Sequence, residues 1–341
     1  MSDKVLIIAE AGVNHNGDLS IARKLIEAAA DAGADCIKFQ TFKAEKLVSA
    51  SAVLADYQAK NTGNTDDSQF VMLKKLEMPE EWYPELKQYA AQHNIIFVST
   101  GFDEDSIDFL DNLGMPFFKI PSGEITNKPF LEHIASKGMP VILSTGMSEI
   151  EEIQAAIQVM IDKGLAKDKI TVLHCNTAYP TPMTDVNLQA MKAIAFELGV
   201  NVGYSDHTLG IEVPIAAVAL GATVIEKHIT LDRNMPGPDH LSSLEPDELK
   251  EMVKAIRNIS LAISGDGQKK PTVSESQNKM IARKSIHLKN QLPAGHLLSS
   301  ADLEMKRPGD GISPMEINKI IGKRIKTDLP FEYKLTLNDL E

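Results

Sequence analysis

The stretch 224–230, Val-Ile-Glu-Lys-His-Ile-Thr, carries three ionisable side chains in the middle of an otherwise strand-like apolar run. Side chains alternate across a strand, so Glu226 and His228 face one side while Lys227 faces the other. Burying a carboxylate and an imidazole without partners is costly. The pair therefore needs a ligand, or it lies at a strand end that is open to water.

A second histidine, His207, follows the preceding predicted strand in the segment GYSDHT. Imidazoles on neighbouring strands come within reach of one ion, and two of them with water and a carboxylate suit Mn²⁺, Zn²⁺ or a related divalent cation. His207 and His228 are therefore candidate metal ligands, with Glu226 as an outer partner that orients His228 or a bound water. A pairing across strands is a weaker signal than a compact motif, so a role without metal stays open.

Basic and hydroxyl groups at other strand ends suit an anion, and together they match a phosphate and a carboxylate carried on one small molecule. These residues are Lys38, Lys119, Ser122, Asn176 and Ser205. Each of these residues has an ordinary alternative role; Lys38, for example, could extend past the strand end to water. Two further hydroxyl residues at a strand end, Ser144 and Thr145, are expected to cap the following helix. No dinucleotide or Walker glycine motif is present, so a nucleotide cofactor is not indicated.

Eight short β-branched runs alternate with amphipathic helical patterns along the first 264 residues. The strand candidates are 5–10, 36–40, 95–100, 117–122, 141–145, 170–175, 200–205 and 223–229. The helical patterns include 19–32, 79–93, 148–163, 188–198 and 246–264, with Asp18 as an expected N-cap and Pro79 in an expected first turn. Strict alternation implies parallel pairing, and eight repeats predict a closed (β/α)8 barrel with polar groups at the strand C-terminal ends.

Two segments depart from this alternation. The stretch 41–69 after the second strand is long and polar without a clear helix, as expected of a functional lid or insertion. The stretch 265–281 is rich in polar residues and turn formers, which predicts a linker between the barrel, 1–264, and a separate small domain, 282–341.

Composition limits the class of protein. A formal net charge of -12 argues against a nucleic-acid surface without excluding an anionic substrate. The two cysteines, Cys36 and Cys175, end apolar runs and are expected to be core thiols in a reducing compartment. With no stretch that predicts a signal peptide or a membrane span, we expect a cytoplasmic enzyme.

A set of motifs spread over essentially the whole chain resembles the sialic acid synthase family. The motifs are IIAEAGVNHNGD, KFQTF, KIPSGEITN, STGM, HCNTAYPTP, GYSDHT, EKHIT with PGPDH, and KRPGDGI. Members of this family make N-acetylneuraminate or the bacterial sugars legionaminic and pseudaminic acid. The tail is similar to the antifreeze-like SAF domain that family members carry after the barrel.

The resemblance implies condensation of phosphoenolpyruvate with the open-chain aldehyde of an N-acetylated hexose, with release of phosphate. It implies that His207 and His228 hold a divalent metal, Mn²⁺ before Mg²⁺ or Co²⁺, and that Glu10 lies near the reacting carbons. The positions that match phosphoenolpyruvate-binding residues are Lys38, Thr100, Lys119, Ser122, Asn176 and Ser205. The positions that match acceptor-binding residues are Gln40, Glu124, Tyr179 and Asp239, joined by Arg307 from the SAF domain. In the family this arginine reaches the partner's site, which implies an intertwined homodimer.

The acceptor sugar stays open. N-acetylneuraminate synthase, acting on N-acetylmannosamine, is the first expectation, and N,N'-diacetyllegionaminate synthase, acting on 2,4-diacetamido-2,4,6-trideoxymannose, is the alternative. Pseudaminate synthase and a non-catalytic SAF-type binding protein are more distant alternatives. The walls that discriminate the acceptors are expected in 41–69 and in the segment NTAYPTP.

Overall fold

The computed structural model describes residues 4–49, 52, 54, 58–59, 61 and 68–341. The chain divides into two compact units, Met1–Ser264 and Gly265–Glu341. Much of the polar stretch 41–69 lies outside the described residues, and with it part of the expected acceptor wall.

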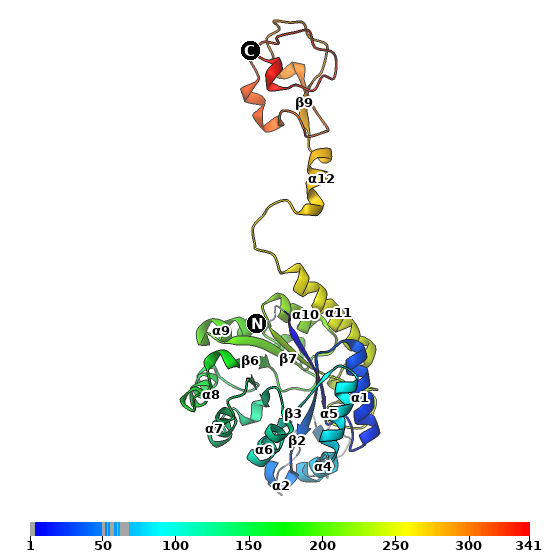
Figure 1. The fold of residues 1–341 in the computed structure, drawn as a ribbon, viewed down its shortest axis with the longest axis vertical. Helices are drawn as coiled ribbons and strands as arrows, with labels where there is room; N and C mark the ends of the chain where they lie inside the picture. Colours follow the sequence, from blue (N-terminus) through cyan, green and yellow to red (C-terminus); the bar gives the residue numbers. More distant parts are fainter. Residues whose placement is uncertain (1–3, 50–51, 53, 55–57, 60, 62–67) are drawn as a thin grey trace. The chain divides into compact units, whose positions relative to one another are not determined.

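The first unit is built on eight parallel strands that Figure 1 shows enclosed by helices. Their bounds are β1 Leu6–Gly12, β2 Cys36–Thr41, β3 Ile96–Gly101, β4 Phe118–Ile120, β5 Val141–Ser144, β6 Ile170–Cys175, β7 Asn201–Asp206 and β8 Val224–His228. The hydrogen-bonded order is β3-β2-β1-β8-β7-β6-β5-β4, and β3 also contacts β4, so the sheet curls round on itself. This arrangement confirms the predicted (β/α)8 architecture.

A helix follows every strand of this sheet. Their bounds are α1 Leu19–Ala32, α2 Ala44–Leu47, α4 Gln69–Leu76, α5 Trp82–Gln92, α6 Glu104–Leu113, α7 Lys128–Ser136, α8 Ile150–Asp162, α9 Leu188–Leu198, α10 Glu212–Ala219 and α11 Pro246–Ala262. α1 shows why these residues form a helix. Asp18 caps it as predicted, accepting hydrogen bonds from the backbone N–H groups of Ser20 and Ile21, and Gly33 ends it with a φ of 83°.

Two predictions about helix starts are wrong. The helix expected to begin at Pro79 begins at Trp82, so the proline lies ahead of the first turn. Ser144 and Thr145 do not cap α8, because Glu149 holds that position and forms a capping box with Glu152. The two hydroxyls are instead buried among the strand ends, where hydroxyls find other partners.

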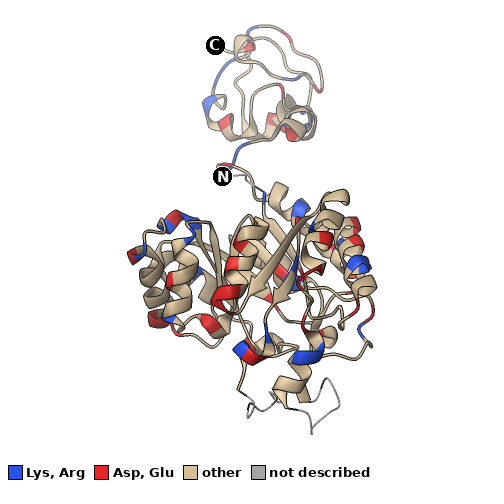
Figure 2. Cartoon of the chain, turned by 60° about the horizontal axis from the view of Figure 1, so that its bottom comes forward, with Lys and Arg blue, Asp and Glu red and all other residues tan. Residues whose placement is uncertain are grey.

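The core lies between the sheet and the inner stripes of the helices. On α1 this stripe consists of Ala22, Leu25, Ile26 and Ala29, the spacing of one helix face. Both cysteines are buried free thiols, as expected. Figure 2 shows acidic and basic residues interspersed along the outer helices in that view. Among the described residues, no helix combines the length and apolar character that crossing a bilayer requires.

The described part of the segment between β2 and α5 has its own small apolar cluster. This segment contains a short helix, α2, within the stretch 41–69, which was expected to lack a clear helix. The cluster consists of Val13, Phe42, Ala44, Met72, Leu73 and Leu76. α2 and α4 thus pack on this apolar cluster, beside the loops that follow β1 and β3.

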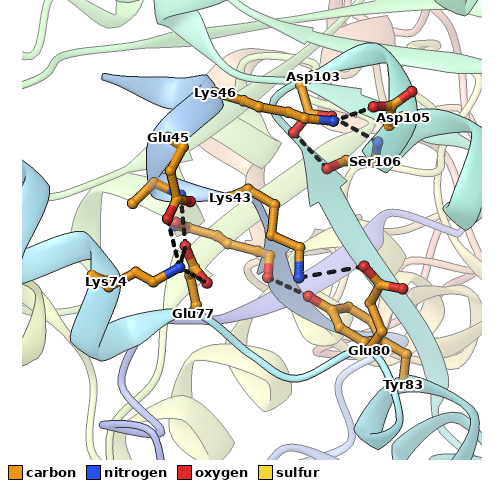
Figure 3. A network of polar contacts seen from close by, with 12 residues as sticks. Lys43, Glu45, Lys46, Lys74, Glu77, Glu80, Tyr83, Asp103, Asp105 and Ser106 are labelled. Atoms are coloured by element: carbon orange, nitrogen blue, oxygen red, sulfur yellow. Dashed lines mark hydrogen bonds and ion pairs between the residues drawn. The ribbon is translucent and has the colours of Figure 1, made fainter. Parts of the chain in front are cut away.

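Ion pairs join α2 to the start of α6 and to α4, as Figure 3 shows. Lys46 pairs with Asp105, in the first turn of α6, and lies 3.7 Å from Asp103, the N-cap of that helix. Lys74 of α4 lies 2.8 Å from Glu45 and 3.1 Å from Glu77. Exposed pairs contribute little singly. Their value here is to fix α2 and α4 beside the carboxyl end of β3.

The second unit has an antiparallel pair, β9 Ser285–Leu288 with β10 Leu303–Lys306, and a compact apolar core of its own. Ahead of it lies α12, Val273–Ala282, whose Thr272 forms a capping box with Glu275. The stretch expected to be a linker therefore contains a capped helix.

Asp35, just before β2, gathers three donors at the bottom of the barrel. Its carboxylate accepts hydrogen bonds from Ile7 N at 2.8 Å and Arg257 Nη2 at 2.6 Å, and it pairs with Lys4 at 2.5 Å. Asp35→Asn should lower the free energy of unfolding by about 1–3 kcal/mol, because it removes the charge that these donors share. Urea unfolding followed by circular dichroism measures the change. Asp31→Asn, on the exposed face of α1, should change it by less than about 0.5 kcal/mol; equal effects would contradict this account.

Candidate active site

The strand register brings three of the predicted site residues into one row. Glu10 of β1 is paired with Lys38 of β2 on one side and with His228 of β8 on the other. Paired positions on neighbouring parallel strands face the same side of the sheet. Alternation then places Glu226 with His228 on the inner side and sends Lys227 outward.

A buried cluster of charges fills the inside of the barrel. Lys38 Nζ lies 2.7 Å from Glu10 Oε2 and 3.6 Å from Glu226 Oε2, and it donates to Thr100 Oγ1 at 3.0 Å. From the opposite side, Lys119 Nζ lies 3.5 Å from Glu226 Oε1. Two ammonium groups and two carboxylates thus balance one another within a few ångströms. Glu226 is the member that both lysines share.

Two hydroxyl groups make hydrogen bonds with this cluster. Ser205 on β7 donates to Glu226 Oε1 at 2.9 Å. Lys119 Nζ donates to Ser144 Oγ at 2.7 Å. Ser144 is therefore a site residue that sequence reasoning missed, because a hydroxyl before a helix suggested a cap. The alternation of β5, which places Ser144 and Ile142 on one face, was the available signal.

The two carboxyl groups have opposite pKa shifts. Burial raises the pKa of Glu10 well above the usual glutamate range, although the Lys38 charge opposes that shift. Burial acts the same way on Glu226, but the charges of Lys119 and Lys38 outweigh it and hold its pKa below the ordinary value. Glu226 is therefore the fixed anion. Glu10 is the carboxyl that can exchange a proton near neutrality.

The two predicted histidines lie together at the barrel mouth. Their ring centroids are 5.4 Å apart, and the Tyr179 ring is centred 4.0 Å from that of His207. His207 Nδ1 makes a 2.6 Å hydrogen bond with the backbone oxygen of Asn176. Since a carbonyl only accepts, Nδ1 carries the proton and Nε2 keeps its lone pair.

This pair fits a divalent cation. Burial lowers the pKa of both imidazoles, that of His207 to about 4, so both are neutral at pH 7. His228 Nδ1 is buried without a hydrogen-bond partner in the described part of the chain. A fixed tautomer and neutral rings are what a metal ligand requires. The described residues contain no group of three or more His, Cys, Asp or Glu side chains suited to one ion, so water or substrate oxygens would complete the coordination.

The other residues expected to bind phosphoenolpyruvate surround this centre. Ser122, in the turn after β4, accepts a hydrogen bond from Gly146 N at 2.9 Å and lies 3.4 Å from Cys175 Sγ. Asn176 follows β6, and its side-chain oxygen accepts from Ala178 N at 2.7 Å. Both present polar groups at the carboxyl ends of strands, where a (β/α)8 enzyme binds its substrate.

The residues expected on the acceptor side are less tightly assembled. Gln40 Nε2 lies 3.5 Å from Glu10 Oε1, and Asp239 is buried with its carboxyl pKa raised to about 6 by burial. Glu124 is half-buried and accepts from Asn127 at 2.6 Å rather than joining the charge cluster. Arg307 belongs to the second unit, where its Nε donates to Ala282 O at 3.0 Å. Its place in an active site stays a prediction.

Loop residues from distant parts of the chain are tied together above the site. Asn14 donates to Ile229 O and to Ser243 Oγ, both at 2.9 Å. Asn16 donates to Pro236 O at 2.9 Å. These asparagines join the β1 loop to the loop after β8. Asn61 adds a 2.7 Å hydrogen bond to Pro238 O from the segment after β2.

The fold and this arrangement are those of a (β/α)8 enzyme with two buried lysines inside its barrel. Residues 25–269 match the model of the NeuB family, and residues 283–331 match that of the SAF domain. The chain therefore belongs to the NeuB family and carries a SAF domain after its barrel, as the resemblance implied. It is a phosphoenolpyruvate-dependent nonulosonic acid synthase.

Two relatives and one solved structure are similar to the chain over most of its length. The N,N'-diacetyllegionaminic acid synthase of Campylobacter jejuni is 52% identical, over 94% of this chain and 95% of that one. The enzyme of the same name from Legionella pneumophila is 49% identical, over 95% and 91%. The crystal structure of N-acetylneuraminic acid synthetase from Leptospira borgpetersenii is 36% identical, with a TM-score of 0.71 over 81% of this chain and 90% of that one.

The Lys119–Ser144 hydrogen bond gives a test of the missed residue. Ser144→Ala should raise the KM for phosphoenolpyruvate about tenfold with a smaller effect on kcat, because Lys119 loses the acceptor that aims its ammonium group. Steady-state phosphate release measures both constants. Ser136→Ala, at the exposed end of α7, is the matched control and should leave them unchanged. An unaltered KM in Ser144→Ala would contradict the role given to this hydroxyl.

Proposed function

We propose that the protein condenses phosphoenolpyruvate with 2,4-diacetamido-2,4,6-trideoxymannose and water, giving N,N'-diacetyllegionaminate and phosphate. The observation that carries the proposal is the identity of about half of all residues with two N,N'-diacetyllegionaminic acid synthases. The N-acetylneuraminic acid synthetase shares fewer residues. The comparisons thus favour the alternative acceptor over N-acetylmannosamine, which the sequence put first.

In this proposal the buried lysines bind the anionic groups of phosphoenolpyruvate. Lys38 and Lys119 lie 3.6 and 3.5 Å from Glu226, and in the proposed complex they exchange these long contacts for a phosphate and a carboxylate. Thr100, Ser122, Asn176 and Ser205 add hydrogen bonds around the same space. The carboxylate of Glu226 keeps both lysines charged and apart before the substrate arrives.

The carboxylates then act on charge that develops during the reaction. C3 of the enolpyruvyl group forms a bond to the aldehyde carbon, the aldehyde oxygen takes up a proton, and positive charge develops at C2. Glu226 and Glu10 stabilise that charge. Water adds to C2 and transfers a proton to Glu10, whose raised pKa suits this step. The C2 hydroxyl of the tetrahedral intermediate then loses its proton and becomes the ketone carbonyl as the C2–O bond to phosphate breaks. The departing phosphate takes up that proton and is stabilised by the lysines, and the proton held by Glu10 replaces the one that the aldehyde oxygen took up.

His207 and His228 would hold a divalent cation, Mn²⁺ before Mg²⁺ or Co²⁺. When bound, such an ion supplies a Lewis acid for the aldehyde oxygen. The residues around it orient the acceptor: the Tyr179 ring covers His207, and the buried carboxyl of Asp239 offers a hydrogen-bonding group to a sugar hydroxyl or amide. Gln40, which lies 3.5 Å from Glu10, and Glu124 are the other residues that we expect to bind the acceptor.

The choice of acceptor is tested by supplying each sugar in turn. With phosphoenolpyruvate and Mn²⁺, the protein should use the 2,4-diacetamido sugar with a kcat/KM about 100-fold above that for N-acetylmannosamine, because a pocket shaped for an amide discriminates against a hydroxyl. Phosphate release and product mass report the reaction, and reactions without acceptor give the background. Preference for N-acetylmannosamine would make the protein an N-acetylneuraminate synthase instead.

We also propose that Arg307 reaches the site of a second subunit in a homodimer. Arg307→Ala and His228→Ala chains should each be nearly inactive alone. Coexpressed at equal levels they should recover about a quarter of wild-type activity, because half of the dimers are mixed and each mixed dimer has one intact site. Activity per dimer, with composition checked by mass spectrometry, measures the rescue. Mixed dimers without activity would argue that each site is built within one chain.

A further inference from the structure

A buried ion pair that the proposed reaction does not use lies on the outer face of the sheet, directly behind the two histidines. Lys227 Nζ donates to Asp206 Oδ2 at 2.6 Å, and neither side chain is exposed at all. The two residues are paired across β7 and β8. They point outward, away from the charge cluster inside the barrel.

The Asp206–Lys227 pair holds the residues on both sides of His207. Asp206 precedes His207, and its carboxylate accepts from the N–H and from the hydroxyl of Thr208, each at 3.0 Å. Lys227 also donates to the backbone oxygen of Thr208. His207 is therefore held between two residues that are fixed to Lys227, and Lys227 itself is joined by one peptide bond to His228.

A buried ion pair is weak support for stability, because the loss of hydration offsets much of the attraction, and apolar replacements of similar volume are often tolerated. Such pairs are best explained where they fix one arrangement of the chain. Here β7 has ended at Asp206, so the strand ladder no longer holds His207 in register with His228. Beyond the end of β7, the hydrogen bonds of Lys227 to Asp206 and Thr208 hold the chain in place instead.

We propose that Asp206, Lys227 and Thr208 are positioning residues that set the separation of His207 and His228 for a divalent cation. The inference rests on the metal role in the proposed function. These three residues touch neither substrate nor metal, and they act through the backbone of the two ligands.

The test is Mn²⁺ binding to the full chain without substrates, measured by the loss of the free Mn²⁺ signal in electron paramagnetic resonance. The double variant Asp206→Leu, Lys227→Met removes both charges and leaves no unpaired ion. It should keep the circular dichroism spectrum of the wild type and bind Mn²⁺ about 10- to 100-fold more weakly. Affinity within twofold of wild type in the folded double variant would overturn the proposal.

Two further variants separate an effect on the positions of the histidines from a general loss of stability. Thr208→Val removes one hydroxyl and should weaken Mn²⁺ binding several-fold with the fold intact; if the double variant does not fold, unchanged affinity here overturns the proposal. Asp35→Asn breaks an ion pair at the other end of the barrel and should leave the Mn²⁺ affinity unchanged, which separates positioning from general loss of stability. Wild-type protein that binds no Mn²⁺ would instead refute the metal role in the proposed function.

Discussion

Glu226 is the residue on which the interior of this barrel depends. It is an anion placed between two buried ammonium groups, and without it Lys38 and Lys119 would face each other across the same space. Lys38 would still have Glu10 as a partner, but the buried charge of Lys119 would not be balanced by its hydrogen bond to Ser144. The carboxylate therefore lets the barrel keep two cations charged in its interior, ready for an anionic substrate.

Strand alternation gives β8 two roles in three residues. Glu226 and His228 face the interior, where one fixes the lysines and the other faces His207. Lys227 between them faces the helices, where it binds Asp206 and the backbone after His207. Of the three ionisable residues in this strand, two thus face the candidate site, and the third has its partner, Asp206, on the outer face of the sheet.

The sequence was sufficient for the barrel because β-branched runs and amphipathic stretches alternate eight times, and that period leaves few topologies. It also placed Glu10, Lys38, Glu226 and His228 together, since residues at the C-terminal ends of parallel strands converge. It was insufficient where partners are distant in the chain. The alternation of β5 shows which face Ser144 is on, but its contact with Lys119, the Asp206–Lys227 pair and the helix α2 depend on tertiary packing. The part played by Arg307 depends on a second chain and stays a prediction.

In the proposed reaction the buried lysines Lys38 and Lys119 form the phosphoenolpyruvate site. Calorimetric titration of phosphoenolpyruvate into the protein without acceptor tests this site. Lys119→Met is compared with Lys137→Met, which changes a partly buried lysine at the end of α7 that pairs with Asp108. We expect Lys119→Met to weaken binding at least about tenfold, since it removes a buried charge, and Lys137→Met to leave it unchanged. Equal affinity in wild type and folded Lys119→Met would contradict the account.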